Sequence, residues 1–306
     1  MTKKTLAYNF PWHTLNDDQY RRVVREYRDW GVDTFVFTEE LAMACLADAQ
    51  RRIFLHDLTR DMGVRFIAMH GLSGMGYDLD TTDPARRPEM IRAHCDAMAL
   101  EAEFGGRTYT VHVGAYHYVH DHVPVPTLRR LAAEALEQLV PVAERLGVIL
   151  AVENSFEPPN SAKEVLALVE PFGDNPAIGV CYDTGHAQHM APYPWKDPAK
   201  YASYMANAWW EGLVEEDDAI GKLSRHVVTT HIHDNSGYAD QHGMPFDGTI
   251  EWDVLMPKLF ACPRMLEYQT EICFDHEPNW AGELLAPKGG YSIKRQVETF
   301  RRLGFP

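Results

Sequence analysis

The feature that most constrains this chain of 306 residues is a regular alternation of short apolar runs with longer amphipathic segments. Short runs rich in β-branched residues predict buried strands, and apolar residues at helical spacing predict helices. The predicted strands lie at 5–9, 34–37, 64–70, 108–112, 148–153, 177–183, 227–233 and 266–272. Alternation of this kind predicts a parallel sheet. Eight strand–helix units in a chain of this length predict a (β/α)8 barrel, or TIM barrel.

The helical segments predicted between the strands lie at 17–30, 39–62, 86–104, 127–146, 161–169, 252–260 and 291–303. A doubly wound sheet is the alternative, but no G-x-G-x-x-G motif follows the first strand. The spare length falls after strands six, seven and eight, at 187–225, 234–251 and 274–290. These enlarged loops all belong to one face of the barrel. No linker or internal repeat divides the chain, so we expect a single domain over residues 1–306.

The charge balance and the cysteines limit the classes of function. Lys and Arg number 29 against 44 Asp and Glu, so the formal net charge is −15. This balance argues against nucleic acid or an anionic membrane as a partner, because both draw on basic surface. The five cysteines are scattered without a C-x-x-C motif, which favours a reducing, cytoplasmic compartment. The start of the chain lacks an apolar signal-peptide region, and no long apolar window predicts a membrane span.

Residue types that bind metals stand at the ends of six successive predicted strands. They are His70, His112, Glu153, Asp183, His231 and Glu271. The active site of a TIM barrel lies at the C-terminal ends of its strands, so these side chains are expected to converge. Three carboxylates buried together need a cation to neutralise them. Imidazoles combined with carboxylates suit Zn²⁺, Mn²⁺, Co²⁺ or Fe²⁺ rather than Ca²⁺.

Each of these residues, taken singly, has an ordinary explanation. A histidine at a strand end is usually a hydrogen-bonded structural residue, and a glutamate there usually faces solvent. The prediction therefore depends on the joint pattern across six neighbouring strands. His231 and His233 point to the same side of the seventh strand, so side alone does not choose between them.

These residues resemble the xylose-isomerase-like TIM-barrel superfamily, which includes ketose epimerases, inosose dehydratase, sugar phosphate isomerases and endonuclease IV. The resemblance runs from strand three to strand eight. It implies a central metal held by Glu153, Asp183, His231 and Glu271. The family's H-x-x-D/E motif matches residues 231–234, which favours His231 as the ligand and leaves His233 and Asp234 as supporting residues.

The chain also resembles endonuclease IV, which binds three zinc ions. That resemblance implies that His70 and His112 join Glu153 on one metal, and that Glu153 bridges to the central metal. The third metal would then be held by His186, Asp240 and His242. We expect one divalent metal, Mn²⁺, Co²⁺ or Zn²⁺, with three as the upper limit. With one metal, the residues expected to contact substrate are Trp12, His70, His112, His186 and His242.

The insertion after strand six is rich in aromatic residues. They are Trp195, Tyr201, Tyr204, Trp209 and Trp210. Together with Trp12 they resemble a lid over a sugar, because aromatic faces pack well against apolar sugar surfaces. The alternative is that these side chains form ordinary core or a subunit interface.

The leading hypothesis is a metal-dependent sugar isomerase or epimerase acting by proton abstraction next to a carbonyl. The resemblance to ketose epimerases implies that Glu153 and Glu271 form the acid–base pair and that His186 binds or protonates a substrate oxygen. A keto-sugar lyase or dehydratase on the same barrel is one alternative. An endonuclease IV-like phosphoesterase with three zinc ions is another, and a non-enzymatic carbohydrate- or metal-binding barrel is a third. We expect a small carbohydrate partner without phosphate, because no Arg/Lys clamp stands on a loop, and a homo-oligomer is compatible with the fold.

Overall fold

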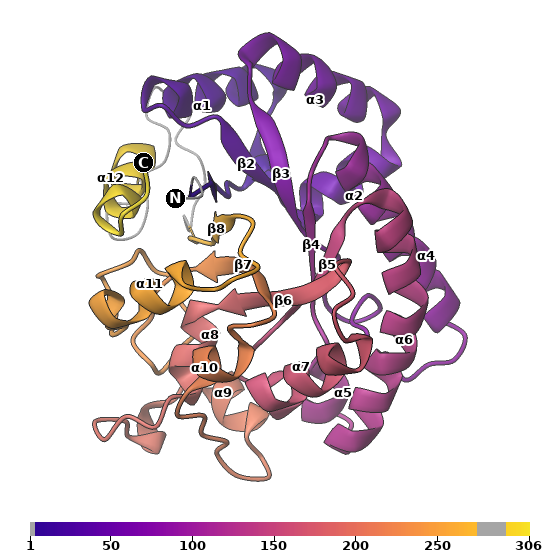
Figure 1. Ribbon diagram of the computed structural model, residues 1–306, viewed down its shortest axis with the longest axis vertical. Helices are drawn as coiled ribbons and strands as arrows, with labels where there is room; N and C mark the ends of the chain where they lie inside the picture. The colour runs from indigo at the N-terminus through magenta and orange to yellow at the C-terminus, as the bar shows by residue number, and fades with distance from the viewer. Residues whose placement is uncertain (1–3, 274–291) are drawn as a thin grey trace.

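The computed structural model describes residues 4–273 and 292–306, and it shows eight parallel strands arranged as a barrel with helices around it (Figure 1). The strands are β1 (Leu6–Ala7), β2 (Thr34–Phe37), β3 (Arg65–His70), β4 (Thr108–Val111), β5 (Ile149–Glu153), β6 (Ile178–Asp183), β7 (Val227–Ile232) and β8 (Tyr268–Thr270). Hydrogen-bonded neighbours follow chain order from β2 to β8, and β8 pairs with β1. A parallel bridge between Tyr8 and Phe35 brings β1 beside β2. The predicted TIM barrel is confirmed.

The helices alternate with the strands as the apolar spacing predicted. The longer ones are α1 (Asp17–Asp29), α2 (Glu39–Ala47), α3 (Ala49–Met62), α4 (Arg87–Glu103), α6 (Val125–Leu146), α7 (Ala162–Val169), α11 (Trp252–Phe260) and α12 (Ile293–Arg302). The single helix expected over 39–62 is two helices instead. Asp48 interrupts it in an extended conformation, and its carboxylate accepts a hydrogen bond from the Gln50 N–H at 2.8 Å. An N-cap of this kind begins a new helix rather than continuing the old one.

Four short helices were not anticipated from the sequence. They are α5 (Tyr116–Val119), α8 (Thr184–Met190), α9 (Ser203–Ala208) and α10 (Ala219–Leu223). They have seven residues or fewer, so each has too few apolar positions for a clear helical period. Three of them fold parts of the enlarged region after β6. The enlarged loop after β7 spans residues 233–251, whereas residues 274–290 of the loop expected after β8 lie outside the described residues.

A cluster of aromatic side chains closes the barrel wall where β1, β2 and β3 meet α1. Trp12 is fully buried and stacks on Tyr20 at 5.6 Å between ring centroids. Phe35 and Phe66 meet the Trp12 ring edge-on at 5.1 and 5.7 Å. The indole N–H of Trp12 donates to the Val36 carbonyl at 3.0 Å, so its polar atom is satisfied inside the core. These contacts hold the segment after β1 against α1, β2 and β3.

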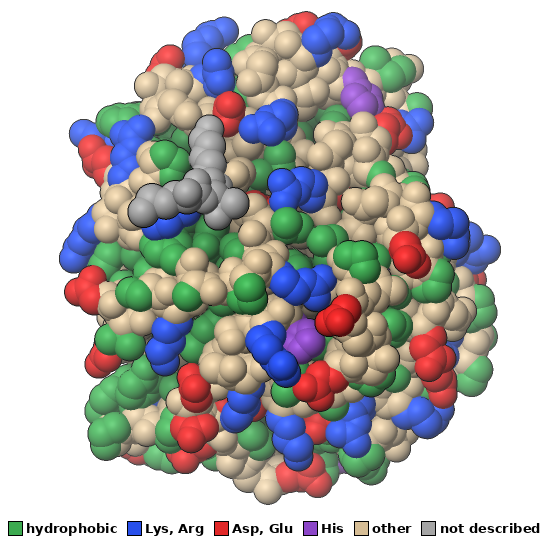
Figure 2. Space-filling view, viewed as in Figure 1, with side chains coloured by type: hydrophobic (Ala, Val, Ile, Leu, Met, Phe, Trp, Pro, Cys, Tyr) green, Lys and Arg blue, Asp and Glu red, His purple; other side chains and the backbone are tan. Residues whose placement is uncertain are grey.

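Charges are dispersed on the face of the molecule that Figure 2 shows. Lys and Arg side chains are interspersed there with Asp and Glu, and they do not merge into one stripe. Nucleic-acid binding draws on a continuous basic surface, and this face does not offer one. Among the described residues, no helix combines the length and the apolar character needed to cross a bilayer.

Part of the barrel interior is polar below the level of the strand ends. Glu267, which precedes β8, is 1 % exposed and accepts a hydrogen bond from the Thr108 hydroxyl across the barrel at 2.5 Å. The nearest cation is the Arg107 guanidinium, 4.0 Å away. Burial raises the pKa of Glu267 to about 7, although the Thr108 hydrogen bond and Arg107 oppose the shift.

We expect Glu267→Gln to weaken the pH dependence of stability. In the wild type the folded-state pKa exceeds the unfolded one, so the buried carboxyl contributes no penalty below about pH 4.5. As the pH rises to 7, the unfolded state ionises first, and the free energy of unfolding falls by up to about 3 kcal/mol. Urea unfolding at pH 5 and pH 8 measures this loss. Glu298→Gln, on the exposed face of α12, should keep the wild-type loss, and an equal loss in Glu267→Gln would contradict the expectation.

Candidate metal centre

Four of the predicted ligands meet at one point above the barrel. Glu153 ends β5, Asp183 ends β6, His231 lies in β7 and Glu271 follows β8. Each offers one ligand atom, and these four atoms all lie within 4.8 Å of one another. The parallel register sets this level, since Asp183 pairs with His231 across β6 and β7. Three of the four residues are at most 2 % exposed, and Glu271 lines the open side.

The contacts within this group fit a cation. The His231 Nδ1 atom lies 3.1 Å from Glu153 Oε1 and 2.9 Å from Glu271 Oε2. Among the described residues, none of these three buried atoms has a hydrogen-bond partner. Buried polar atoms are normally satisfied, so a cluster of orphaned ones turned toward a common centre calls for a ligand. A divalent metal bound by carboxylate oxygens and an imidazole nitrogen matches this donor set.

A second group adjoins the first through Glu153. His112, just after β4, places its Nε2 atom 2.9 Å from Glu153 Oε2, the carboxylate oxygen not turned toward His231. His70, at the end of β3, stacks on the His231 ring at 5.2 Å with an interplanar angle of 9°. Its Nε2 atom lies 3.6 Å from Glu271 Oε1. Glu153 therefore faces both groups, one oxygen to each.

A third group of potential ligands adjoins Asp183. His186, in α8, places its Nε2 atom 3.4 Å from Asp240 Oδ2, and His242 Nε2 lies 3.1 Å from the same oxygen. The position of His186 follows from the start of α8, because Asp183 accepts the His186 backbone N–H at 2.6 Å. His233 joins this group, with ligand atoms within 4.8 Å of the other three residues. The sequence thus anticipated three of its four members.

His233, expected from the sequence to be a supporting residue, lies directly against Asp183. It is fully buried, and its Nε2 atom lies 2.9 and 3.0 Å from the two Asp183 carboxylate oxygens. Its ring stacks on His242 at 4.0 Å with an interplanar angle of 3°. The sequence feature that indicates this position is that His231 and His233 point to the same side of the seventh strand.

Asp234 supports the loop that carries Asp240 and His242. Its carboxylate accepts hydrogen bonds from the N–H groups of Phe246 and Ile250 and from the indole of Trp252. The backbone of Asp234 also pairs with Gly243 in an antiparallel bridge. The carboxylate is therefore fully used in holding residues 234–252 in place, as expected of a supporting residue.

Charges in the centre compensate one another. Burial alone would lower the pKa of His112, but the Glu153 carboxylate outweighs it and raises this pKa to about 9. Burial likewise opposes the shift of His242, whose pKa the Glu271 and Asp240 carboxylates raise to about 9. For Glu271, burial would raise the pKa, yet His231 and His242 hold it well below its ordinary value. The Glu271 carboxylate is therefore ionised at neutral pH and available to a cation.

Two further residues that were not predicted from the sequence lie at the centre. His189, three residues after His186 in α8, is 1 % exposed, and its Nε2 atom lies 3.9 Å from Asp240 Oδ1. Neither of its ring nitrogens has a hydrogen-bond partner among the described residues. Cys181, one level below Asp183 in β6, lies with Glu153 and His231. The helical spacing of His189 from His186 and the strand spacing of Cys181 from Asp183 were the signals.

Some of the aromatic residues expected to contact substrate lie in the core, and one contacts the centre. Trp12 lies in the core described above and lines neither cavity beside the centre, so the structure does not bring it to the ligands. Trp209 is also buried, with its indole N–H donating to the Phe156 carbonyl at 2.9 Å. Tyr204 is half-exposed, and its hydroxyl accepts a hydrogen bond from the Asp240 N–H at 2.6 Å. Tyr204 thus connects the insertion after β6 directly to the centre.

Two cavities flank the ligands. One, of about 380 Å³, is lined by Asn9, His13, Glu39, His70 and Glu271, among others. The other, of about 360 Å³, is lined by Asp78, His112, Glu153, Glu157 and Asn160, among others. Within the described part of the chain, neither lining includes a lysine or an arginine. Both cavities therefore favour a neutral or cationic ligand over a phosphate or carboxylate.

Comparison with known proteins finds one family whose sequence model covers most of the chain. The sequence model of the family described as "Xylose isomerase-like TIM barrel" matches residues 24–286. The "Uncharacterized protein y4fM" of Sinorhizobium fredii is 32% identical over 101 residues, which is 32% of this chain and 23% of that protein. The chain thus matches about a quarter of the length of that relative.

Solved structures share the architecture. A "D-tagatose 3-epimerase-like protein" superimposes with a TM-score of 0.69 at 16% identity, covering 98% of this chain and 96% of that one. The apo form of "3-keto-D-glucoside 4-epimerase, YcjR, from E. coli" gives a TM-score of 0.67 at 14% identity over 99% of both chains. At these identities the likeness establishes the fold.

We expect removal of bound metal to destabilise the protein. A metal that binds only the folded state at about 100 times its dissociation constant adds ~2.7 kcal/mol to the free energy of unfolding. Treatment with a chelator should therefore lower the melting temperature by a few degrees, and added Mn²⁺ or Zn²⁺ should restore it. Differential scanning calorimetry with elemental analysis measures both effects.

The matched variants are Glu271→Gln, which removes one ligand oxygen, and Glu298→Gln, which lies on the exposed face of α12. The first should lose most of its response to chelator and metal, and the second should respond like the wild type. A melting temperature that chelation leaves unchanged, in protein shown to have lost its metal, would argue against this site.

Proposed function

This chain belongs to the xylose isomerase-like TIM barrel family, and from that premise we propose that it is a divalent-metal-dependent sugar isomerase or epimerase. The observation that carries the proposal is the placement of Glu153 and Glu271. Their carboxylates approach His231 Nδ1 to 3.1 and 2.9 Å from two different strands. Two carboxylates that share one centre are the arrangement needed to take a proton from one carbon and return one to it or its neighbour. The names of the two structural neighbours, one a 3-keto-D-glucoside 4-epimerase and the other D-tagatose 3-epimerase-like, support a carbohydrate substrate.

The residues that would hold the central metal are Glu153, Asp183, His231 and Glu271. When bound there, Mn²⁺, Co²⁺ or Zn²⁺ would polarise a carbonyl and its neighbouring hydroxyl and so acidify the adjacent C–H bond. His70 and His112 with Glu153, and His186, Asp240 and His242 with His233, form the two groups that could hold further ions. The minimal enzyme needs the central metal alone.

Proton transfer is assigned to the two glutamates. In this proposal one carboxylate oxygen of Glu153 removes the proton next to the carbonyl. Glu271 first takes up a proton from water and then delivers it from its own side of the site. Glu271 lines the cavity of about 380 Å³, and Glu153 lines the cavity of about 360 Å³. The substrate would thus lie between the two cavities, with one carboxylate on each side. Opposed carboxylates allow a change of configuration rather than simple return of the same proton.

His186 and Tyr204 complete the proposed site. His186 Nδ1 lies 3.1 Å from the Asn154 carbonyl, which orients the ring and leaves Nε2 toward Asp240. We assign His186 the role of holding or protonating a substrate oxygen. Tyr204, bonded to the Asp240 N–H, would cover the substrate from the insertion after β6. The absence of Lys and Arg from both cavity linings, within the described residues, favours a sugar without phosphate.

A phosphoesterase is the second candidate, and the three adjoining ligand groups favour it. Every ligand type of a trinuclear site is present, and Glu153 is shared between two groups. The acidic cavity linings and the net charge of −15 oppose a polyanionic substrate. Cleavage of an oligonucleotide with an abasic site, by protein loaded with three zinc ions, would favour the phosphoesterase over the epimerase.

We expect Glu153→Gln and Glu271→Gln each to reduce turnover by about 10²-fold or more, because each removes a proton-transfer group. The assay follows deuterium uptake from D₂O and product formation by NMR, on a panel of free ketoses and 3-keto-glucosides. Metal content is measured in each variant, and Glu298→Gln serves as the matched control. Wild-type turnover in both glutamine variants with metal bound would exclude this mechanism.

The same NMR experiment separates the reaction types. An epimerase or isomerase gives an isomer of the substrate that carries deuterium at the reacting carbon. A keto-sugar lyase or dehydratase begins with the same proton abstraction but gives an unsaturated product. Product of the second kind would keep the assigned roles of Glu153 and Glu271 and change the reaction class.

A further inference from the structure

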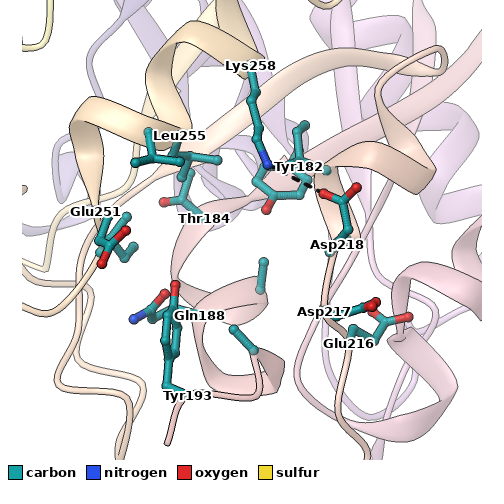
Figure 3. Close-up of a pocket in the computed structure, with 16 residues that line it drawn as sticks. Tyr182, Thr184, Gln188, Tyr193, Glu216, Asp217, Asp218, Glu251, Leu255 and Lys258 are labelled. Carbon is teal, nitrogen blue, oxygen red and sulfur yellow. Dashed lines mark ion pairs between the residues drawn. The ribbon is translucent and has the colours of Figure 1, made fainter. Parts of the chain in front are cut away.

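A separate cavity of about 120 Å³ lies on the outer side of the barrel wall, behind the metal centre (Figure 3). Tyr182 of β6 and Thr184 of α8 line it, and they flank Asp183, whose side chain turns to the opposite, inner side. Residues 216–220, which lead into α10, form one wall, and Glu251 with α11 forms another. None of the ligand residues described above lines this cavity, so it is distinct from the proposed substrate site.

Thr184 separates the cavity from the centre. Its hydroxyl donates to the His233 carbonyl at 2.7 Å and accepts the His233 N–H at 3.1 Å. Thr184 therefore has both of its hydrogen-bonding functions used on the inner side. A molecule in the cavity would meet the outer surface of this wall and could not reach the metal ligands.

The Tyr182 hydroxyl is the unusual group in the cavity. The residue is 4 % exposed, and its hydroxyl forms no hydrogen bond with another described residue; the oxygen itself is open to the cavity. Figure 3 shows the hydroxyl directed into the space between Gln188, Tyr193 and the acidic residues of the far wall. Tyrosines buried to this extent usually find a hydrogen-bond partner for the hydroxyl. A bound molecule with a hydrogen-bonding group would supply it.

The charged residues of the lining are mostly acidic. They are Glu216, Asp217, Asp218, Glu251 and Lys258. Lys258 is committed to Asp218, 3.6 Å away, and Glu216 accepts the N–H groups of Ala162 and Lys163 that begin α7. Lys222 lies 3.6 Å from Glu216 and 3.7 Å from Asp217, whereas Glu251 forms no ion pair among the described residues. The remaining acceptors, Glu251 and the Tyr182 hydroxyl, thus call for a positively charged donor.

A metal ion does not suit this cavity. Among the described residues, no group of three His, Cys, Asp or Glu side chains converges here, unlike the centre on the other side of the wall. Instead, the rest of the lining is apolar. It includes Ala187, Ala191, Ile220, Ile250, Val254 and Leu255. A cation with a short hydrocarbon body can satisfy the polar groups and cover this apolar surface at once.

We propose that this cavity is a binding site for a small alkylammonium ion. The ammonium donates to the Tyr182 hydroxyl oxygen and lies within the field of Glu251, and its hydrocarbon chain packs on the apolar wall. The volume of about 120 Å³ accommodates a body of a few heavy atoms and excludes a sugar ring with its hydroxyls. The site does not depend on the proposed catalytic function, because it shares no residue with it.

The test is isothermal titration of the metal-saturated full-length protein with butylammonium at low salt. Metal saturation keeps the probe away from the carboxylates of the metal centre. We expect saturable binding with a dissociation constant of about 1 mM, as for other ligands of a few heavy atoms. 1-Butanol, the uncharged analogue, should bind roughly fivefold more weakly or not at all, because it lacks the charge.

Two variants locate the binding. Tyr182→Phe removes only the hydroxyl and should raise the dissociation constant roughly fivefold. Glu251→Gln, at an exposed position, should raise it roughly threefold and lose its effect at high salt. Glu298→Gln on α12 is the control with an equal change of charge and should bind butylammonium like the wild type. Circular dichroism checks that each variant is folded.

The proposal is overturned by any of three results. Butylammonium fails to saturate the wild type at about 50 mM, far above the expected dissociation constant. Alternatively, 1-butanol binds as tightly as butylammonium, which shows that charge plays no part. Finally, folded Tyr182→Phe and Glu251→Gln both bind like the wild type, which places the probe elsewhere. Weakening in either variant with an unchanged control supports the site.

Discussion

The structure depends on the need to neutralise carboxylates that are buried together. Glu153 and Asp183 are at most 2 % exposed, and Glu271 stands beside them with its ligand oxygen within 4.8 Å of theirs. Isolated buried carboxylates in such proximity would repel one another and lose their hydration. The surrounding imidazoles supply positive charge, and the orphaned oxygens leave room for a cation. The stability of this end of the barrel and its chemistry therefore have the same origin.

The register of the parallel strands brings the ligand residues to one level of the barrel. Strands in a parallel barrel end at one face, so a single ligand on each of several strands suffices to build a dense centre. The pairing of Asp183 with His231 sets two ligands at one level. Asp240 and His242 lie on a loop rather than on a strand, so their positions depend on contacts within that loop. Asp234 binds three N–H donors of residues 246–252 and fixes the loop that presents Asp240 and His242.

One strand segment serves two sides of the wall. Along β6, Asp183 turns inward to the ligands, and Tyr182 turns outward to the cavity between α8, α10 and α11. This division follows from the alternation of side chains along a strand. It gives the protein two chemically different environments separated by Thr184: a cluster of convergent ligand residues on the inner side and an acidic, partly apolar cavity on the outer side. The acidic character of both agrees with the excess of Asp and Glu in the chain.

The sequence by itself determined the barrel and most of the central site. Strand and helix periods are local properties, so the alternation and the ligand types at the strand ends could be recognised without coordinates. Tertiary structure decided the rest. It placed Trp12 in the core and not at the centre, because four aromatic side chains from separate segments pack around one another there. It brought His233 and His189 to Asp240, and it placed Tyr182 and Glu251 in the lining of one cavity, across separations that no local pattern encodes. Such neighbours are fixed by the packing of distant segments and by loop geometry, which a single sequence does not reveal.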